Sequence, residues 1–239
     1  MIIQAVVFDL DGVLVDTEEV WDSVRYEFAT AHGGRWRPQG DQAAVMGANS
    51  MQWAASMREN NGVDLPDQAI YEGIVGRLRE RYACHLPLMP GAAEAVAGLA
   101  SAYHLGVASS SPLEIIEYVL GLADLRRYFS AVVSSDEVAV GKPAPDVYLE
   151  ACARLKTRPE RAAAVEDSAS GIQAAHSAGL AVIAIPNRKF PPAPDVLALT
   201  DVVLDSVGRL DREVVASLGG RARGPLARGS GDGPSAGRP

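Results

Sequence analysis

The sequence predicts an α/β fold, with a parallel sheet covered by helices on both faces and an all-helical insertion near the start of the chain. Two observations predict the sheet: short apolar runs rich in valine and isoleucine recur, and segments with helical periodicity separate most of them. A third observation predicts the insertion. The stretch 17–86 contains helical patterns and no convincing strand.

The apolar residues of the predicted strands form continuous runs rather than alternating with polar ones, which is typical of strands buried on both faces. They are the segments 2–9, 105–110, 131–135, 162–167, 181–186 and 201–205. One of the helical segments between them, SPLEIIEYVLGLA, begins with Ser111, Pro112 and Glu114, a pattern that predicts a capping box at the start of a helix. Strands that alternate with helices in this way form parallel sheets.

Apolar residues recur at helical spacing within the insertion, as in Trp21, Val24 and Phe28. We therefore expect residues 1–16 and 87–218 to form an α/β core domain and residues 17–86 to form a helical domain. The segment 219–239 is rich in glycine, arginine, proline and serine. Its low apolar content predicts a disordered tail.

Composition limits the classes of partner. The chain has 239 residues and a formal net charge of −8, and it has no dense basic cluster, which argues against binding nucleic acid or an anionic membrane. No apolar run is long enough to cross a bilayer. Cys84 and Cys152 form no CxxC motif, and the N-terminal residues do not resemble a secretion signal, so we expect two free thiols and a cytoplasmic location. The default expectation for the oligomeric state is a monomer.

Polar side chains follow four of the predicted strands. They are Asp9 and Asp11, then Ser109 and Ser110, then Lys142, and finally Glu166 and Asp167. Ligands of open parallel sheets bind beyond the carboxyl ends of the strands, so we expect these side chains to converge at one edge of the sheet. Each motif alone is common in turns and helix caps, but their joint order predicts a functional site.

This set of side chains suits the chemistry of phosphate esters. Carboxylates crowded together repel one another unless a cation joins them, and carboxylate oxygens are preferred ligands of Mg²⁺. Magnesium and a lysine together would attract a phosphate dianion and neutralise charge that develops at phosphorus. One aspartate could then attack phosphorus while its neighbour transfers the proton, which explains a pair of aspartates on one short turn.

With these residues in place, the sequence resembles the haloacid dehalogenase superfamily of phosphotransferases. FDLDGVLVDT, VASSS, GKPAPDVY and VEDSASG resemble the four motifs of that superfamily in order, and the resemblance extends from residue 2 to about 210. It implies a Rossmann-like core, and it implies that the helical insertion is a cap that closes over the active site and selects the substrate.

The resemblance also implies roles for individual residues. Asp9 would be the nucleophile and a metal ligand. Asp11 would be the general acid and base and would offer its backbone carbonyl to the metal. Asp167 would be a further Mg²⁺ ligand, with Glu166 in support.

In the same comparison, the transferring phosphate would be held by Ser109, Ser110 and Lys142. The implied activity is Mg²⁺-dependent hydrolysis of a small phosphorylated metabolite, such as a sugar phosphate, through an aspartyl-phosphate intermediate. Asp11 favours phosphate chemistry because the dehalogenases of the superfamily do not have this second aspartate.

A phosphosugar mutase similar to β-phosphoglucomutase is the alternative. That enzyme carries a histidine and a cap arginine where this chain has Trp21 and Ser50, and it has lysine and asparagine where this chain has Pro112 and Leu113. The loss of these polar groups favours hydrolysis. A non-catalytic module that binds a phosphorylated ligand is the third hypothesis, but a binding module has no need of a nucleophile and a proton carrier together.

Three residues of the insertion are candidates for substrate selection: Trp21, Ser50 and Trp53. The indole of Trp53 could stack on a sugar ring or define an apolar pocket. Packing within the helical insertion is the alternative, since large aromatic side chains at helical spacing are commonly buried.

Overall fold

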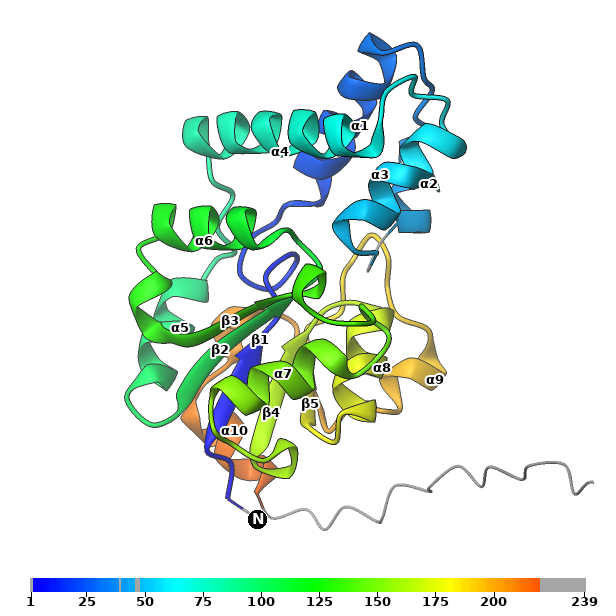
Figure 1. The fold of residues 1–239 in the computed structure, drawn as a ribbon. Helices are drawn as coiled ribbons and strands as arrows, with labels where there is room; N and C mark the ends of the chain where they lie inside the picture. The colour runs from blue at the N-terminus through cyan, green and yellow to red at the C-terminus, as the bar shows by residue number, and fades with distance from the viewer. Residues whose placement is uncertain (1, 39, 46–47, 220–239) are drawn as a thin grey trace, which may run out of the picture.

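The computed structural model describes residues 2–38, 40–45 and 48–219, and within them six parallel strands form a sheet in the order β3-β2-β1-β4-β5-β6 (Figure 1). The strands are β1 (Ala5–Phe8), β2 (His104–Ser109), β3 (Phe129–Ser134), β4 (Ala162–Glu166), β5 (Ala181–Ala184) and β6 (Val202–Val203). Each lies within or overlaps one of the six predicted segments. The predicted α/β class with a parallel sheet is therefore confirmed.

The central strand β1 explains why the sheet is covered on both sides. All four of its residues are fully buried. Val6 and Phe8 belong to one apolar cluster, whereas Ala5 and Val7 belong to a second cluster on the opposite face, because successive side chains of a strand point to opposite faces. The sheet is thus the middle layer of three.

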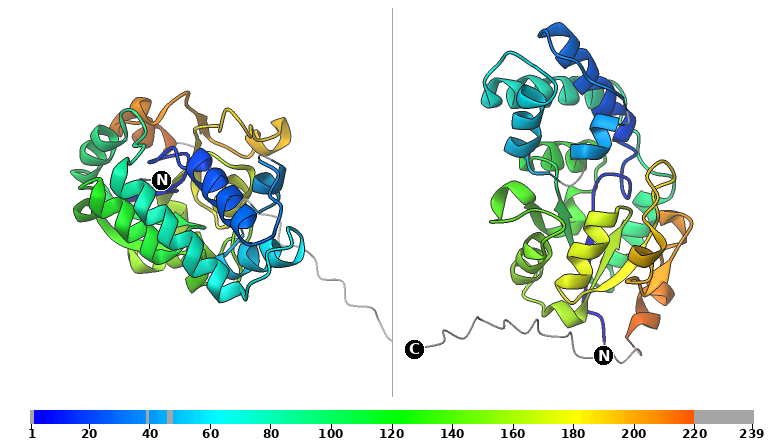
Figure 2. Two further views of the ribbon diagram at one scale, coloured as in Figure 1. Left: turned by 90° about the horizontal axis from the view of Figure 1, so that it is seen from above. Right: turned by 90° about the vertical axis from the view of Figure 1, so that its right-hand side faces the viewer.

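Ten α-helices surround and extend this sheet in the described part of the chain. They are α1 (Glu18–Ala31), α2 (Gly40–Val45), α3 (Ser50–Glu59), α4 (Asp67–Cys84), α5 (Ala92–Ala100), α6 (Leu113–Leu122), α7 (Asp146–Arg154), α8 (Ala169–Ser177), α9 (Pro194–Leu197) and α10 (Arg212–Leu218). Side chains of α5, α6 and α10 share the cluster of Val6 and Phe8, and those of α7, α8 and α9 share the other. Figure 2 shows helices on both sides of the sheet.

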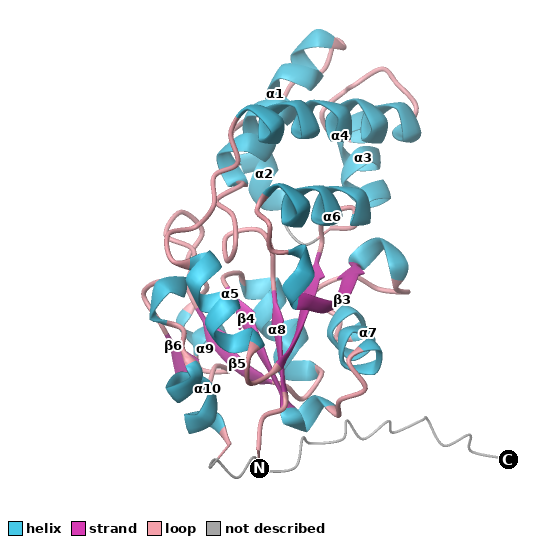
Figure 3. Cartoon of the chain, turned by 90° about the vertical axis from the view of Figure 1, so that its left-hand side faces the viewer, coloured by secondary structure: helices cyan, strands magenta, loops and turns pink. Residues whose placement is uncertain are grey.

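Helices α1 to α4 lie together beyond one end of the sheet, where α4 packs against α6 of the core (Figures 1 and 3). The apolar faces predicted from the sequence hold them together: Trp21, Val24 and Phe28 of α1 are buried, as are Ile70 and Ile74 of α4. The described residues between 18 and 84 contain no strand. We call these four helices the helical insert.

Two adjacent chain segments connect the helical insert to the sheet. The backbone N–H of Asp16 donates to the carbonyl of Pro87 at 2.8 Å, and Val15 forms an isolated antiparallel bridge with Leu88. The entry and the exit of the insert are therefore paired side by side.

One local prediction is wrong. Helix α6 begins at Leu113 with Pro112 as its N-cap residue, and no side chain caps it. The hydroxyl of Ser111 instead donates to Oδ2 of Asp11 at 2.7 Å, and Glu114 accepts a hydrogen bond from the hydroxyl of Tyr71 in α4. Tertiary contacts have taken both side chains away from the predicted capping box.

Among the described residues, no helix has both the length and the apolar character that crossing a bilayer requires. The described chain ends at Gly219, next to α10. The predicted disordered tail, 219–239, lies outside the described residues apart from its first residue.

Candidate active site

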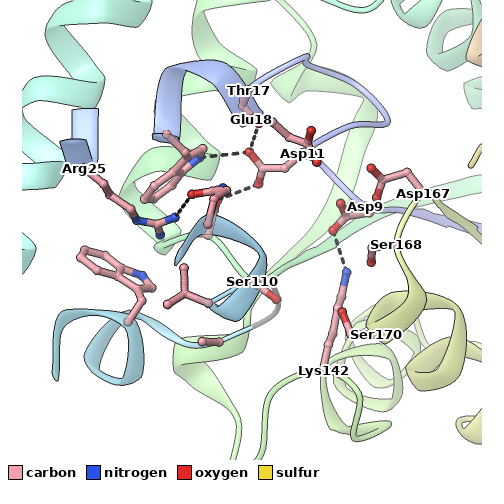
Figure 4. A pocket seen from close by; sticks show the side chains of 16 residues that line it. Asp9, Asp11, Thr17, Glu18, Arg25, Ser110, Lys142, Asp167, Ser168 and Ser170 are labelled. Carbon is pink, nitrogen blue, oxygen red and sulfur yellow. Dashed lines mark hydrogen bonds and ion pairs between the residues drawn. The ribbon is translucent and has the colours of Figure 1, made fainter. Parts of the chain in front are cut away.

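A cavity of about 100 Å³ lies between the carboxyl ends of the strands and the helical insert (Figure 4). Asp9, Asp11, Lys142 and Asp167 line it from the sheet side. Trp21, Arg25 and Trp53 are among the residues that line it from the insert. The convergence predicted from strand topology therefore occurs, and the insert closes the opposite wall.

Asp9 follows β1 directly, and the sheet fixes its position because its N–H donates to the carbonyl of Val165 in β4 at 2.9 Å. The residue is 6% exposed. Lys142, from the loop between β3 and α7, places its ammonium 2.6 Å from Oδ1 of Asp9 and 2.6 Å from Oε1 of Glu166. The lysine thus joins the ends of two neighbouring strands.

Glu166 is the last residue of β4 and is fully buried. Besides Lys142, its carboxylate accepts hydrogen bonds from the hydroxyls of Tyr148 at 2.7 Å and Ser168 at 3.1 Å. Gly171 makes room for it, since a Cβ at that position would lie 1.8 Å from Oε1 of Glu166. With both oxygens engaged, Glu166 is suited to hold Lys142 in place.

Asp167 is buried beside the turn that follows β1. Its Oδ2 accepts a hydrogen bond from Nδ2 of Asn187 at 3.0 Å, and the same nitrogen donates to Glu18 of α1. Gly12 has a positive φ of 80°, and a Cβ there would lie 1.9 Å from Oδ2 of Asp167. Glycine is therefore required both for the turn and for the close approach of Asp167.

The negative charges of Asp9, Glu166 and Asp167 outnumber the single positive charge of Lys142. Burial, together with the charges of Glu166 and Asp11, raises the pKa of Asp9 to about 8 although Lys142 opposes the shift. Burial, together with the charges of Glu166 and Asp9, raises the pKa of Asp167 well above its usual range. Burial disfavours the charge of Lys142, but Asp9 and Glu166 more than offset this and raise its pKa.

The donor set fits a divalent cation. Asp9, Glu166 and Asp167 each offer a carboxylate oxygen, and these oxygens lie within 4.8 Å of one another. Three carboxylates and one lysine carry a net charge of −2 when ionised, which a divalent cation would balance. Hard oxygen donors are those that Mg²⁺ prefers. Because Glu166 is already bound by Lys142 and Tyr148, Asp9 and Asp167 are the side chains better placed to hold the ion.

Asp11 lies on the other side of the turn, away from Lys142. Its Oδ1 accepts hydrogen bonds from the hydroxyl of Thr17 and from Nε1 of Trp21, the latter at 3.3 Å. Its Oδ2 accepts from Ser111 at 2.7 Å and makes a longer contact of 3.4 Å with the hydroxyl of Ser109. These partners hold a partly buried carboxyl at the cavity wall, where it can exchange a proton with a bound molecule.

The remaining predicted residues lie in different places. Ser109 is fully buried, and its Oγ accepts the N–H of Ser111 at 3.0 Å, so it supports the loop after β2. Ser110, Trp21 and Trp53 line the cavity. Ser50 is not among the lining residues. Its N–H donates to Asp136 of the core at 2.8 Å, and its hydroxyl donates to the same carboxylate.

Several residues that contribute to the site were not predicted from the sequence. Ser111 and Thr17 bind Asp11, Tyr148 binds Glu166, and Asn187 binds Asp167. Arg25 also lines the cavity. For Arg25 the sequence does hold a signal, because a charged residue four positions after Trp21 and three before Phe28 falls on the apolar face of a helix.

Comparisons with known proteins show which family and which proteins the chain resembles. Residues 3–179 match the family described as haloacid dehalogenase-like hydrolase. The chain is 32% identical to hexitol phosphatase B of Escherichia coli (strain K12), over 87% of this chain and 94% of that protein.

Two solved structures extend the comparison. CbbY from Rhodobacter sphaeroides in complex with phosphate is 29% identical, with a TM-score of 0.81 over 90% of this chain and 100% of that one. A β-phosphoglucomutase from Clostridium difficile has a TM-score of 0.79 over 91% of this chain and 97% of that one. At 21% identity it shows the shared fold alone.

Proposed function

This chain belongs to the haloacid dehalogenase-like hydrolases and is a phosphatase, and on that premise we propose that it is Mg²⁺-dependent and hydrolyses a small phosphorylated metabolite through an aspartyl-phosphate intermediate. A phosphorylated carbohydrate is the substrate class that the relatives favour, since hexitol phosphatase B and the phosphorylated carbohydrates phosphatase of Thermotoga maritima are both 32% identical. The single observation that carries the mechanism is the buried Asp9–Lys142 contact of 2.6 Å beside Asp11 and Asp167.

In the first step, Asp9 is the nucleophile. Lys142 donates to Oδ1, so we assign Oδ2 as the attacking atom. A bond forms between this oxygen and phosphorus, the bond from phosphorus to the ester oxygen breaks, and protonated Asp11 donates its proton to the departing oxygen. The result is phosphorylated Asp9 and a released alcohol.

In the second step, Asp11 reverses its role. As a carboxylate it accepts a proton from a water molecule whose oxygen attacks phosphorus. The bond to Asp9 breaks and inorganic phosphate leaves. Thr17, Trp21 and Ser111 keep Asp11 oriented through both proton transfers.

Other residues support the phosphoryl group. Lys142 neutralises negative charge on the phosphoryl oxygens, and Ser110 offers a hydroxyl to them from the cavity wall. Asp9 and Asp167 would hold Mg²⁺ with the backbone carbonyl of Asp11. When bound, this ion would supply charge that brings the phosphate dianion close to a carboxylate.

We propose further that the helical insert, residues 17–86, is a cap over the core formed by residues 1–16 and 87–218. Its residues Trp21, Arg25 and Trp53 form the wall opposite the carboxylates, which supports a role in substrate selection. The insert would open and close about the paired segments near Asp16 and Pro87.

Phosphate release from a set of sugar phosphates and an aryl phosphate, with and without Mg²⁺, tests this function. Asp9→Asn is expected to abolish release, whereas Asp205→Asn, at an exposed position of the core, is expected to release phosphate at the wild-type rate. Release by Asp9→Asn at the wild-type rate would exclude Asp9 as the nucleophile. Interconversion of sugar phosphates without release of phosphate would instead establish the mutase.

A further inference from the structure

Arg25 is a buried cation at the insert end of the cavity (Figure 4). Its side chain projects from α1, and the residue is 5% exposed. It forms no ion pair with any described carboxylate. Exposed arginines of the same insert do form such pairs, as Arg58 does with Asp67 and Arg81 does with Glu27. The most deeply buried arginine of the described residues thus has no ionic partner.

Three indoles surround the guanidinium. Its central carbon lies 4.5 Å from the ring centroid of Trp21, 5.2 Å from that of Trp53 and 5.7 Å from that of Trp36. Cation–π attraction favours this arrangement. With indoles near the guanidinium, a ligand would be bound through the rim of the group, where its N–H groups lie.

The hydrogen-bonding capacity of that rim is largely unused. A guanidinium has five N–H groups. Within the described chain, Nη1 donates to Oε1 of Gln42 at 2.6 Å, while the buried Nε has no partner. A buried donor without an acceptor is energetically unfavourable, so native proteins rarely leave one unmatched.

Burial lowers the pKa of Arg25 to about 10 despite the nearby charges of Asp11 and Asp22. The side chain is therefore still protonated at neutral pH. A protonated, dehydrated guanidinium binds carboxylates and phosphates strongly, often through two parallel hydrogen bonds.

The position of Arg25 relates it to the reaction. Trp21 packs against the guanidinium and also donates to Oδ1 of Asp11 at 3.3 Å. Arg25 thus lies across one indole from Asp11, whereas Asp9, Lys142 and Asp167 form the opposite part of the same cavity. A molecule whose phosphoryl group lies at Asp9 would extend its other end towards Arg25.

We propose that Arg25 is a specificity-determining residue that binds a second anionic group, a carboxylate or a second phosphate, at the end of the substrate away from the transferred phosphoryl group. This inference rests on the proposed function. A purely structural arginine, held by tryptophans, is the competing explanation, but it leaves the unpartnered Nε without a role.

Matched substrates separate the two explanations. Glycerol 3-phosphate and 3-phosphoglycerate differ only in an alcohol or a carboxylate at the far end, and fructose 1-phosphate and fructose 1,6-bisphosphate differ in an alcohol or a phosphate. The wild type is expected to have the higher kcat/KM for the anionic member of at least one pair. The first pair reports on a carboxylate and the second on a phosphate.

Arg25→Gln is expected to lower the ratio of kcat/KM between the two members by about tenfold or more, the size of a lost charge-assisted hydrogen bond. Arg77→Gln is the matched control, because Arg77 lies over the ring of Phe28 at 4.8 Å in the same insert and does not line the cavity. Its ratio should equal that of the wild type. An equal loss on both members in Arg25→Gln would overturn the proposal, as would a wild type that favours the neutral members.

Two further measurements keep the test decisive. If circular dichroism shows that Arg25→Gln does not fold, Arg25→Lys replaces it. Lysine keeps a cation among the indoles but lacks the planar fork of the guanidinium. An unchanged ratio of kcat/KM between the anionic and neutral substrates in Arg25→Lys would contradict recognition by the guanidinium. In an Asp9→Asn background, 3-phosphoglycerate should raise Tm more than glycerol 3-phosphate does, or the bisphosphate more than the monophosphate. Equal shifts within both pairs would overturn the Arg25 proposal, whereas absence of turnover in the wild type would count against the proposed function alone.

Discussion

At the scale of single residues, Lys142 determines the electrostatics of the site. Its ammonium is shared by Asp9 and Glu166, and among the described residues no other cation forms an ion pair with any of the three clustered carboxylates. A single positive charge cannot neutralise three buried negative charges, so protons or a metal ion must supply the rest. The raised pKa values of Asp9 and Asp167 express this competition.

The competition between protons and a metal ion for these carboxylates predicts how Mg²⁺ affects the thermal stability of the protein. The pKa of Asp9 is about 8 in the folded protein, against 3.8 for a free aspartate, so the metal-free folded state binds this proton more tightly than the unfolded state does. The contribution of Asp9 to the free energy of unfolding therefore falls as pH rises from about 4 to about 8. Because Mg²⁺ binds the ionised carboxylate, we expect saturating Mg²⁺ to raise Tm more at about pH 8.5 than at about pH 6.

Differential scanning fluorimetry with and without Mg²⁺ or a chelator measures this effect. Asp9→Asn removes the titrating group and should reduce the dependence of the Mg²⁺ shift on pH, while Asp205→Asn should behave as the wild type does. A Mg²⁺ shift that is larger at the lower pH would contradict this account of the site.

At the scale of secondary-structure elements, the packing of α8 against the end of β4 fixes Glu166 and through it Lys142. Gly171 lies in the first turn of α8, and an added Cβ would meet the Glu166 carboxylate at 1.8 to 2.1 Å. We predict that Gly171→Ala displaces Glu166, destabilises the protein by about 1–3 kcal/mol and lowers kcat/KM at least roughly tenfold.

Denaturant unfolding and steady-state kinetics test this prediction. Gly121→Ala is the control, because Gly121 lies within α6 and a Cβ there meets nothing within 4 Å. That change should leave activity intact and, because alanine favours the helix, should not destabilise the protein. Equal effects of the two substitutions would show that the fit of Gly171 against Glu166 is unimportant.

A second contact between elements holds the insert near the core. The Asp136 carboxylate, just after β3, accepts two hydrogen bonds from Ser50 at the first position of α3. A negative charge on Asp136 is also favoured, because its carboxylate lies at the N-terminus of helix α3. We predict that Asp136→Asn weakens this contact, raises KM and makes the buried Trp21 and Trp53 more accessible.

Quenching of tryptophan fluorescence by acrylamide measures that accessibility, with Asp205→Asn again as the control. The expected rise in KM is about twofold to tenfold, the size of one ordinary hydrogen bond, because the asparagine keeps an oxygen that can still accept from Ser50. Unchanged quenching and unchanged KM in a folded Asp136→Asn protein would show that the Ser50–Asp136 contact does not hold the insert closed.

At the scale of the whole molecule, strand topology explains why so much could be predicted from the sequence. Each of Asp9, Lys142 and Asp167 follows its own buried strand or lies in a loop after one, and the carboxyl ends of parallel strands meet at one edge. Local apolar patterns therefore sufficed to predict both the six strands and the convergence of the charged residues.

The residues that escaped prediction depend on contacts between distant segments. Ser111 looks like a helix cap in its local pattern, yet its hydroxyl binds Asp11, a hundred positions earlier in the chain. Ser50 lies in the region of the insert expected to face the substrate, yet it binds Asp136. Local periodicity does not encode which partner such a polar side chain meets. Arg25 is an intermediate case, because its helical position indicates burial but not its three tryptophan neighbours.

The most direct test of the account is chemical trapping of phosphorylated Asp9. Wild-type protein would be mixed with Mg²⁺ and a sugar phosphate that it hydrolyses, quenched during turnover and treated with borohydride, which reduces an acyl phosphate to an alcohol. Peptide mass spectrometry is expected to find homoserine at position 9, only when both substrate and Mg²⁺ were present. Homoserine at another aspartate, or none at all in a sample that was releasing phosphate, would contradict nucleophilic catalysis by Asp9.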